Sequence, residues 1–321
     1  MKIGVSSASL YPLHAEDAFA ELAALGVRCA ELFANSTCEA RDPVVGEIEQ
    51  TCRQNGIEVL SFHPFSSPME SVYLFSTYDR RIEEMIQLYS EFFGTMKRLG
   101  AKIFVLHGAI LSSKCPPEHY VKQFRLLAET GRKYGVTVAQ ENVSYCLSGD
   151  LEFLKMMKRE LGGYARFVLD LKQVRRAHGD TFEYIRALGE NIVHLHISDG
   201  SVERDCLPVG HGEFDFRRLM REMDALGYSG AYMMELYRQN YDEFARLRES
   251  TGSRTSRTAW VSDKIDLLIY QEVSIVFAAG VTRIPAFSFL PCGRGTLPCS
   301  GCCSRVSRRP RECCGTSGLR R

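Results

Sequence analysis

The fold of this chain is indicated by four stretches: VTVAQEN (residues 136–142), ARFVLD (165–170), VHLHISD (193–199) and AYMMELY (231–237). Each is a short apolar, β-branched or aromatic run that leads into a charged or imidazole side chain. Those side chains are Glu141, Asp170, His196 and Glu235, and a polar turn and a helix-like segment follow each one. Short apolar runs of this kind are typical of parallel strands that are buried on both faces.

The same alternation of strand-like and helix-like segments extends along residues 1–250. Segments with helical spacing of apolar residues separate these runs. A glycine that is expected to end the helix stands shortly before the next run, as at Gly26, Gly56, Gly100, Gly135 and Gly227. A doubly wound, flavodoxin-like sheet would need fewer units and usually shows a glycine-rich phosphate loop after its first strand, where SSASLYP (6–12) stands instead. We therefore predict an α/β fold, a (β/α)₈ TIM barrel, with strands at Lys2–Ser7, Val27–Phe33, Ile57–His63, Lys102–His107, Val136–Glu141, Ala165–Asp170, Ile192–Ile197 and Ala231–Glu235.

In such a barrel the carboxyl ends of all the strands open on one face. Glu141, Asp170, His196 and Glu235 should therefore converge there. Three carboxylates and an imidazole would repel one another unless a divalent cation lay among them. Oxygen and nitrogen ligands without thiolate suit Mn²⁺, Mg²⁺, Fe²⁺ or Zn²⁺. The pattern indicates a metal-dependent enzyme.

Composition limits the classes of partner. The chain has 321 residues, 45% hydrophobic and 25% charged, which is ordinary for a globular protein. Residues 1–250 carry 29 basic and 35 acidic residues, a local charge of −6 that disfavours nucleic acid as a partner. We see neither a signal peptide before the first strand nor an uninterrupted apolar span, and we expect a cytoplasmic protein without a membrane segment.

Residues 251–321, which we call the tail, differ from the predicted barrel at 1–250. The tail holds eleven Lys and Arg against four acids and has six cysteines between Cys292 and Cys314. Cys299 and Cys302 have the spacing of zinc ligands. The adjacent cysteine pairs and the Arg, Ser, Gly and Pro around them favour a poorly ordered, atypical tail instead, and a frame-shifted terminus would explain it.

The motifs just quoted, together with GHGEFDF at 210–216, resemble the xylose isomerase-like TIM barrel superfamily, which includes sugar phosphate isomerases and epimerases and endonuclease IV. The resemblance covers about residues 1–250. It implies that Glu141, Asp170, His196 and Glu235 bind one divalent metal ion, most often Mn²⁺, with Mg²⁺, Co²⁺, Fe²⁺ or Zn²⁺ as alternatives. His194 lies two residues before His196 and is expected to pack one layer deeper.

The expected reaction is isomerisation or epimerisation of a sugar or keto-polyol. A base removes the proton next to a carbonyl, and the metal stabilises the resulting enediolate. Glu141 and Glu235 are the expected acid–base pair. We expect substrate contacts from His63, His107, Gln173, Asp199 and Asp205, whereas Lys172 is as readily explained as a solvated side chain. The sequence leaves the oligomeric state open, with a homo-oligomer as one option.

Two alternatives use the same barrel. A dehydratase acting on a keto-inositol shares the metal and the α-proton chemistry. A nuclease like endonuclease IV, acting at abasic DNA, would use His63 and His107 for further zinc. That enzyme has a His three residues after the Asp and an Asp-x-His in a later loop, where this chain has Gln173 and Asp205-Cys206-Leu207. A three-zinc cluster would therefore lack two ligands.

Overall fold

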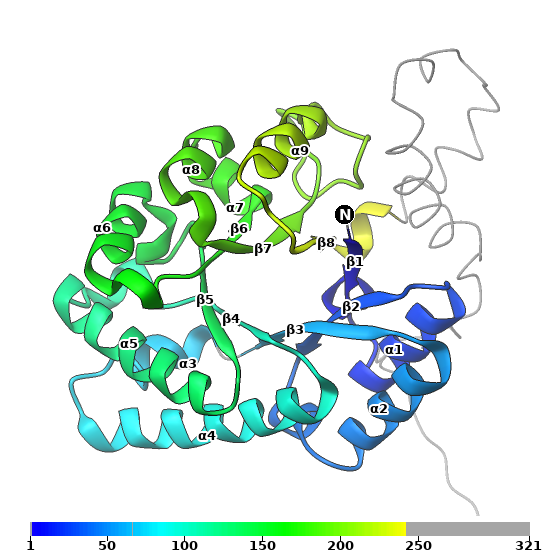
Figure 1. Cartoon of the computed structure of the whole chain (residues 1–321), viewed down its shortest axis with the longest axis horizontal. Coiled ribbons are helices and arrows are strands. Elements are labelled where there is room, and N and C mark those ends of the chain that lie inside the picture. The colour runs from blue at the N-terminus through cyan, green and yellow to red at the C-terminus, as the bar shows by residue number, and fades with distance from the viewer. Residues whose placement is uncertain (1, 66, 242–321) are drawn as a thin grey trace, which may run out of the picture. The chain divides into compact units, whose positions relative to one another are not determined.

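The computed structural model of the protein describes residues 2–65 and 67–241. Within them, eight parallel strands form a closed barrel in which each strand pairs with the next and β8 pairs with β1 (Figure 1). The strands are β1 Lys2–Ser6, β2 Cys29–Ala34, β3 Glu58–Pro64, β4 Ile103–Leu106, β5 Thr137–Glu141, β6 Phe167–Asp170, β7 Ile192–Ile197 and β8 Ala231–Met234. The predicted TIM barrel is confirmed, and the predictions about the tail lie outside the described residues.

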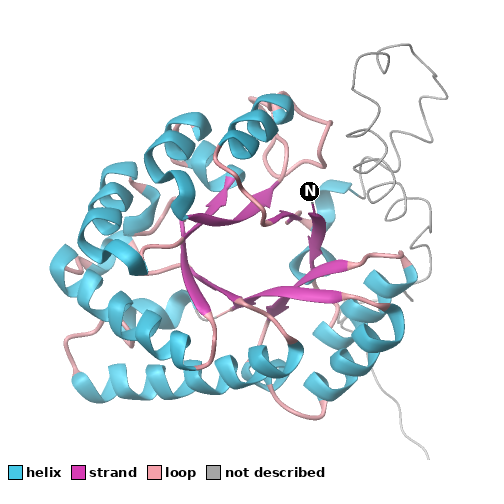
Figure 2. Cartoon of the chain, viewed as in Figure 1, coloured by secondary structure: helices cyan, strands magenta, loops and turns pink. Residues whose placement is uncertain are grey.

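Helices surround the ring of strands (Figure 2). They are α1 Ala15–Ala24, α2 Val44–Asn55, α3 Ser67–Val72, α4 Asp79–Leu99, α5 Pro117–Lys133, α6 Leu151–Leu161, α7 Leu171–Arg176, α8 Thr181–Leu188 and α9 Phe216–Ala225. The five glycines expected to end helices have positive φ angles between 65° and 84°. No described helix is long and apolar enough to cross a membrane.

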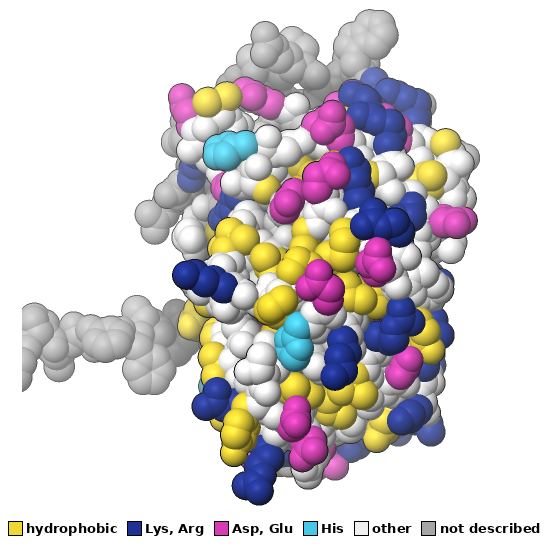
Figure 3. Space-filling view, turned by 90° about the vertical axis from the view of Figure 1, so that its left-hand side faces the viewer, with side chains coloured by type: hydrophobic (Ala, Val, Ile, Leu, Met, Phe, Trp, Pro, Cys, Tyr) yellow, Lys and Arg dark blue, Asp and Glu magenta, His cyan; other side chains and the backbone are white. Residues whose placement is uncertain are grey.

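The main core lies between the helices and the outer face of the barrel. The longest helix, α4, buries Tyr89, Phe92, Phe93 and Met96 completely, and Phe92 and Phe93 pack near aromatic side chains of β3 and β4. On the outer surface that faces the viewer in Figure 3, lysines and arginines are mixed with acidic side chains, so that face carries no single sign of charge.

A second, smaller set of apolar side chains fills the barrel interior. Val105, Ala139 and Val168 form a buried cluster separate from the main core. Side chains two positions apart on a strand point to the same face. The residues two positions further along these three strands therefore stand above the apolar cluster at the carboxyl ends of the strands: His107, Glu141 and Asp170.

Gly108, which follows His107, is required by both backbone and packing. Its φ angle is 95°, and a Cβ atom there would lie 2.0 Å from the hydroxyl of Tyr120. Gly108→Ala should lower the free energy of unfolding by about 2–4 kcal/mol. The added methyl group makes the left-handed backbone conformation unfavourable, and it also clashes with the hydroxyl of Tyr120. Denaturant titration measures this.

Gly135→Ala is the matched control. Gly135 has a φ angle of 75° but nothing within 4 Å of the added Cβ, so only the backbone term of about 1–2 kcal/mol should remain. Equal losses in the two variants would contradict the packing argument at Gly108.

Candidate metal and active site

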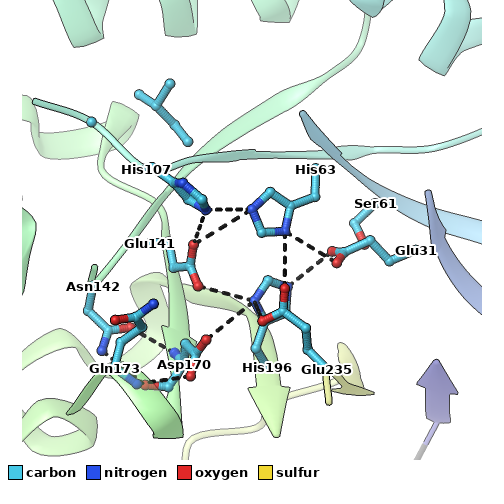
Figure 4. Close-up of polar contacts among 12 residues, drawn as sticks. Glu31, Ser61, His63, His107, Glu141, Asn142, Asp170, Gln173, His196 and Glu235 are labelled. Atoms are coloured by element: carbon cyan, nitrogen blue, oxygen red, sulfur yellow. Dashed lines mark hydrogen bonds and ion pairs between the residues drawn. The ribbon is translucent and has the colours of Figure 1, made fainter. Parts of the chain in front are cut away.

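The carboxyl ends of β5, β6 and β7 and the residue after β8 bring Glu141, Asp170, His196 and Glu235 together (Figure 4). One potential ligand atom from each of the four residues lies within 4.8 Å of the others. All four residues are buried. The structure therefore brings together the four side chains that the sequence predicted to converge.

The ring of His196 is oriented by a further carboxylate outside this group of four, Glu31. Its Nε2 lies 3.1 Å from Glu31 Oε2. Its Nδ1 faces the other three candidate ligands, at 3.3 Å from Glu141 Oε1, 3.6 Å from Glu235 Oε2 and 4.0 Å from Asp170 Oδ2. Burial lowers the pKa of His196, but the charges of Glu31 and Glu235 and the hydrogen bonds to Glu141 and Glu31 raise it well above its usual range, so the imidazole is charged without a metal. With a metal bound, the proton would stay on Nε2, donated to Glu31, and the lone pair of Nδ1 would face the cluster.

Glu31 on β2 is a residue that the sequence analysis did not single out. It is completely buried and accepts a 2.7 Å hydrogen bond from Ser61, and His194 and His63 approach it at 3.3 and 3.5 Å. Burial alone would raise the pKa of Glu31, but the charge of His196 and hydrogen bonds from His194, His196 and His63 hold it well below its usual range. The available signal was an acid inside the apolar run CAELFA (29–34).

His63 and His107 form a second donor group with Glu141. Their Nε2 atoms are 2.6 Å apart, and His107 Nε2 lies 2.9 Å from Glu141 Oε2. Glu141 thus faces His196 through one oxygen and His107 through the other. The expectation that His63 and His107 line the site agrees with these positions, and His194 packs one layer below them against Glu31 and Ser61.

Lys172 is buried beside the cluster, so the reading of it as a solvated side chain is wrong. Its ammonium donates a 2.9 Å hydrogen bond to Glu235 Oε2 and lies 3.3 Å from Asp170 Oδ2. The reason is local. Asp170 caps the N-terminus of α7 by accepting from the backbone of Gln173, so the helix starts directly at the strand end. The first turn of α7 therefore directs Lys172 toward the cluster at the carboxyl ends of the strands.

Three further residues expected to contact substrate hold loops in place. Gln173 accepts hydrogen bonds from the amide and hydroxyl of Ser144. Asp199 accepts from three backbone amides of its own loop at 2.8–3.1 Å. Asp205 pairs with Arg175 and Arg176 beside a cavity of about 740 Å³. Among the described residues, none of the three belongs to a potential metal-binding group.

The four-residue cluster suits a divalent cation. Glu141 Oε2 and Asp170 Oδ2 are buried and accept no hydrogen bond of regular geometry; their nearest partners are the cationic groups of ion pairs, His107 Nε2 at 2.9 Å and Lys172 Nζ at 3.3 Å. Burial raises the pKa of Asp170 to about 7, and the charges of Glu141 and Glu235 add to this while those of Lys172 and His196 oppose it. Carboxylates that destabilise one another in this way, next to an imidazole nitrogen, form a donor set of the kind that Mn²⁺ and similar ions prefer.

Glu70 on α3 holds the backbone next to His107 in place. It is buried, accepts hydrogen bonds from Tyr89 (3.0 Å) and from the backbone amide of Gly108, and so fixes the turn after His107. Burial raises the pKa of Glu70 to about 7, although His107 and the two hydrogen bonds lower it. The sequence offered no periodic signal for this residue, because it lies in a short helix between β3 and α4.

We expect Glu31→Gln to weaken Mn²⁺ binding by about 10–100-fold. A neutral amide oxygen is a weaker acceptor than a carboxylate for the Nε2 proton of His196, so it orients the ring less firmly. Isothermal titration calorimetry measures the affinity. Glu39→Gln is the control, since Glu39 is also a buried carboxylate that accepts backbone hydrogen bonds, but from Ala15 and Asn35 outside the site. An equal effect of both substitutions would contradict the role of Glu31.

The raised pKa of Glu70 predicts a pH dependence of stability. The folded protein holds this proton up to about pH 7, whereas the unfolded chain releases it near 4.5. The contribution of Glu70 is therefore largest at low pH and is lost as pH rises from 4.5 to 7. Between pH 5 and 8, the unfolding free energy of the parent should fall by about 2–3 kcal/mol relative to Glu70→Gln. A difference that is constant with pH would argue against the shift.

Comparison with known proteins supports the family predicted from the motifs. An uncharacterised protein of Mycobacterium leprae is 26% identical over 223 residues, which cover 63% of this chain and 75% of that protein. The structure is similar to a D-psicose 3-epimerase of Clostridium cellulolyticum solved with D-tagatose, with a TM-score of 0.64, 15% identity and coverage of 86% and 97%. It is also similar to an E. coli 3-keto-D-glucoside 4-epimerase, with a TM-score of 0.61, 16% identity and coverage of 78% and 99%. At such identities, these two structures show the fold alone. The model of the xylose isomerase-like TIM barrel family matches residues 19–261, and the chain belongs to that family.

Proposed function

We propose that the protein is a divalent-metal-dependent isomerase or epimerase of a sugar or a sugar-like keto compound. The observation that carries this proposal is the buried meeting of Glu141, Asp170, His196 and Glu235 at the carboxyl ends of the strands. These four residues would hold the metal, with Mn²⁺ as the favoured ion. When bound, the metal would supply Lewis-acid stabilisation for the negative charge that develops on a substrate oxygen.

Glu141 and Glu235 would move the proton. They reach the cluster from different sides, one from the end of β5 and the other from just after β8. Each has its own nitrogen partner, because His107 Nε2 lies 2.9 Å from Glu141 Oε2 and Lys172 Nζ lies 2.9 Å from Glu235 Oε2. Two carboxylates on different sides of one carbon can remove a proton from one face and return it to the other.

Exposure indicates the side from which substrate would approach. The side chains of His107 and Glu235 are 16% and 11% exposed, whereas those of Glu141, Asp170 and His196 are 1% exposed. A small substrate would therefore reach the site over His107 and Glu235. The apolar cluster of Val105, Ala139 and Val168 lies below and keeps water from that side, which strengthens the electrostatic interactions within the site.

The structural similarity to epimerases supports the sugar class, because those solved structures are named for acting on ketohexoses or a keto-glucoside. A keto-inositol dehydratase would use the same four residues and the same removal of a proton next to a carbonyl. It remains the alternative within this class of chemistry.

One observation favours the nuclease alternative: His63, His107 and Glu141 form a second potential metal-binding group. Other observations weigh against it. Gln173 stands where endonuclease IV has a zinc-binding histidine, and it accepts a hydrogen bond from Ser144. Cys206 and Leu207 are buried in the loop where that enzyme has its second zinc-binding histidine. We therefore favour a small-molecule substrate and expect no nucleic acid partner.

Turnover tests the proposal. With Mn²⁺ and a panel of ketoses, keto-inositols and hydroxypyruvate, the parent should convert at least one compound, and the product should gain deuterium from deuterated water unless the proton is passed internally. Glu141→Gln and Glu235→Gln should each lower kcat by about 100- to 10,000-fold, because the amide cannot accept the proton. Nuclear magnetic resonance measures both the product and its deuterium content.

Glu58→Gln serves as the control, since Glu58 is an exposed carboxylate paired with Lys2 at the opposite end of β3. It should leave turnover unchanged. Cleavage of an abasic-site oligonucleotide without turnover of any compound in the panel would favour the nuclease, and retained turnover in both active-site variants would refute the assigned acid–base pair.

A further inference from the structure

Lys172 places a positive charge directly beside the proposed metal ligands. Its Nζ atom lies 2.9 Å from Glu235 Oε2 and 3.3 Å from Asp170 Oδ2. We propose that Lys172 is an internal counter-ion of the site, which shares Asp170 and Glu235 with the divalent metal and thereby weakens metal binding. This inference rests on the proposed function, because it concerns the affinity of the same site for its metal.

Lys172 balances part of the negative charge that the barrel buries. Glu31, Glu141, Asp170 and Glu235 are all buried within one connected network, and buried carboxylates are costly unless a positive charge or hydrogen bonds compensate them. The histidines compensate Glu31 and Glu141. Lys172 compensates Asp170 and Glu235, so the barrel can keep these residues together before a metal binds.

Lys172 and a bound metal would compete for the same oxygen atoms. Glu235 Oε2 and Asp170 Oδ2, the oxygens closest to Lys172, are also the oxygens of those residues that face His196 Nδ1, at 3.6 and 4.0 Å. A divalent ion held by these oxygens and by Nδ1 would therefore lie close to the ammonium. Two positive charges a few ångströms apart in a buried site repel strongly, so the lysine must lower the affinity for the metal.

Lys172 also has little freedom to move away from the carboxylates. Its side chain is 5% exposed, and its ammonium lies 5.2 Å from the centre of the Tyr237 ring. Arg176 donates a 2.9 Å hydrogen bond to the hydroxyl of Tyr237 and is itself paired with Asp205. Tyr237 and the side chains paired around it therefore lie next to the buried lysine and restrict a swing into solvent that would relieve the repulsion.

The test measures metal affinity and metal-induced stabilisation in the full-length protein. Lys172→Met keeps an unbranched side chain only one atom shorter and removes the charge. It should bind Mn²⁺ at least about 10-fold more tightly than the parent in isothermal titration calorimetry, because the repelling charge is gone. In chelator its Tm should fall below that of the parent, so the increase in Tm on adding Mn²⁺ should be larger.

Two variants separate the charge from packing. Lys172→Arg keeps the charge and should bind Mn²⁺ within about 3-fold of the parent, since the repulsion persists. Lys158→Met removes a lysine that donates to the carbonyls of Ala187 and Leu188 and belongs to no described metal-binding group. It should lower Tm equally with and without Mn²⁺ and leave the affinity unchanged.

The outcomes distinguish this inference from the proposed function. A parent protein that binds no Mn²⁺ would overturn the metal centre itself. A parent that binds Mn²⁺ together with a Lys172→Met variant of equal or weaker affinity would overturn the counter-ion alone. If Lys172→Met folds only when Mn²⁺ is present, the inference is supported. If neither Lys172→Met nor Lys172→Gln folds even with Mn²⁺, the lysine is structural and the inference is wrong.

Discussion

Carboxylates gathered in a buried space repel one another, and this repulsion accounts for the arrangement of the side chains around them. Glu141, Asp170 and Glu235 meet at the mouth of the barrel, where burial and the neighbouring acids raise the pKa of Asp170 to about 7. In water such charges would be screened, but above an apolar layer they interact strongly. Each nearby nitrogen therefore has a role in keeping the group together, from the imidazoles of His107 and His196 to the ammonium of Lys172.

The barrel holds this group by means of rigid elements. Strand ends position the carboxylates, and short hydrogen-bonded links tie one strand end to the next. Asn142, next to Glu141, exchanges two hydrogen bonds with the backbone of Asp170, at 2.7 and 3.0 Å. Asp170 also caps α7, which makes one side chain both a structural cap and a candidate ligand. Geometry fixed in this way suits a site that must bind an ion and a small substrate in one arrangement.

The site also shows why related barrels can support different reactions. The four candidate ligands suit removal of a proton next to a carbonyl, whereas His63 and His107 extend the donor set toward a second group that shares Glu141. The polar residues around this shared centre are engaged in hydrogen bonds within the chain: Gln173 accepts from Ser144, and Asp199 accepts from backbone amides of its loop. Choice among reactions in such a fold depends on these surrounding residues more than on the ligands themselves.

Patterns along the chain were sufficient for the barrel and for the meeting of Glu141, Asp170, His196 and Glu235. Parallel strands have an apolar signature, and their carboxyl ends share one face, so local sequence determines which residues converge. Glu31 and Lys172 could not be found in the same way. Glu31 contacts His196, 165 residues away, across the barrel interior, and Lys172 meets Glu235, 63 residues away, because α7 begins at once after β6. Which strands end in polar groups can be read from local sequence. Which buried charges face one another cannot, because those contacts form only when the barrel closes and brings distant strands together.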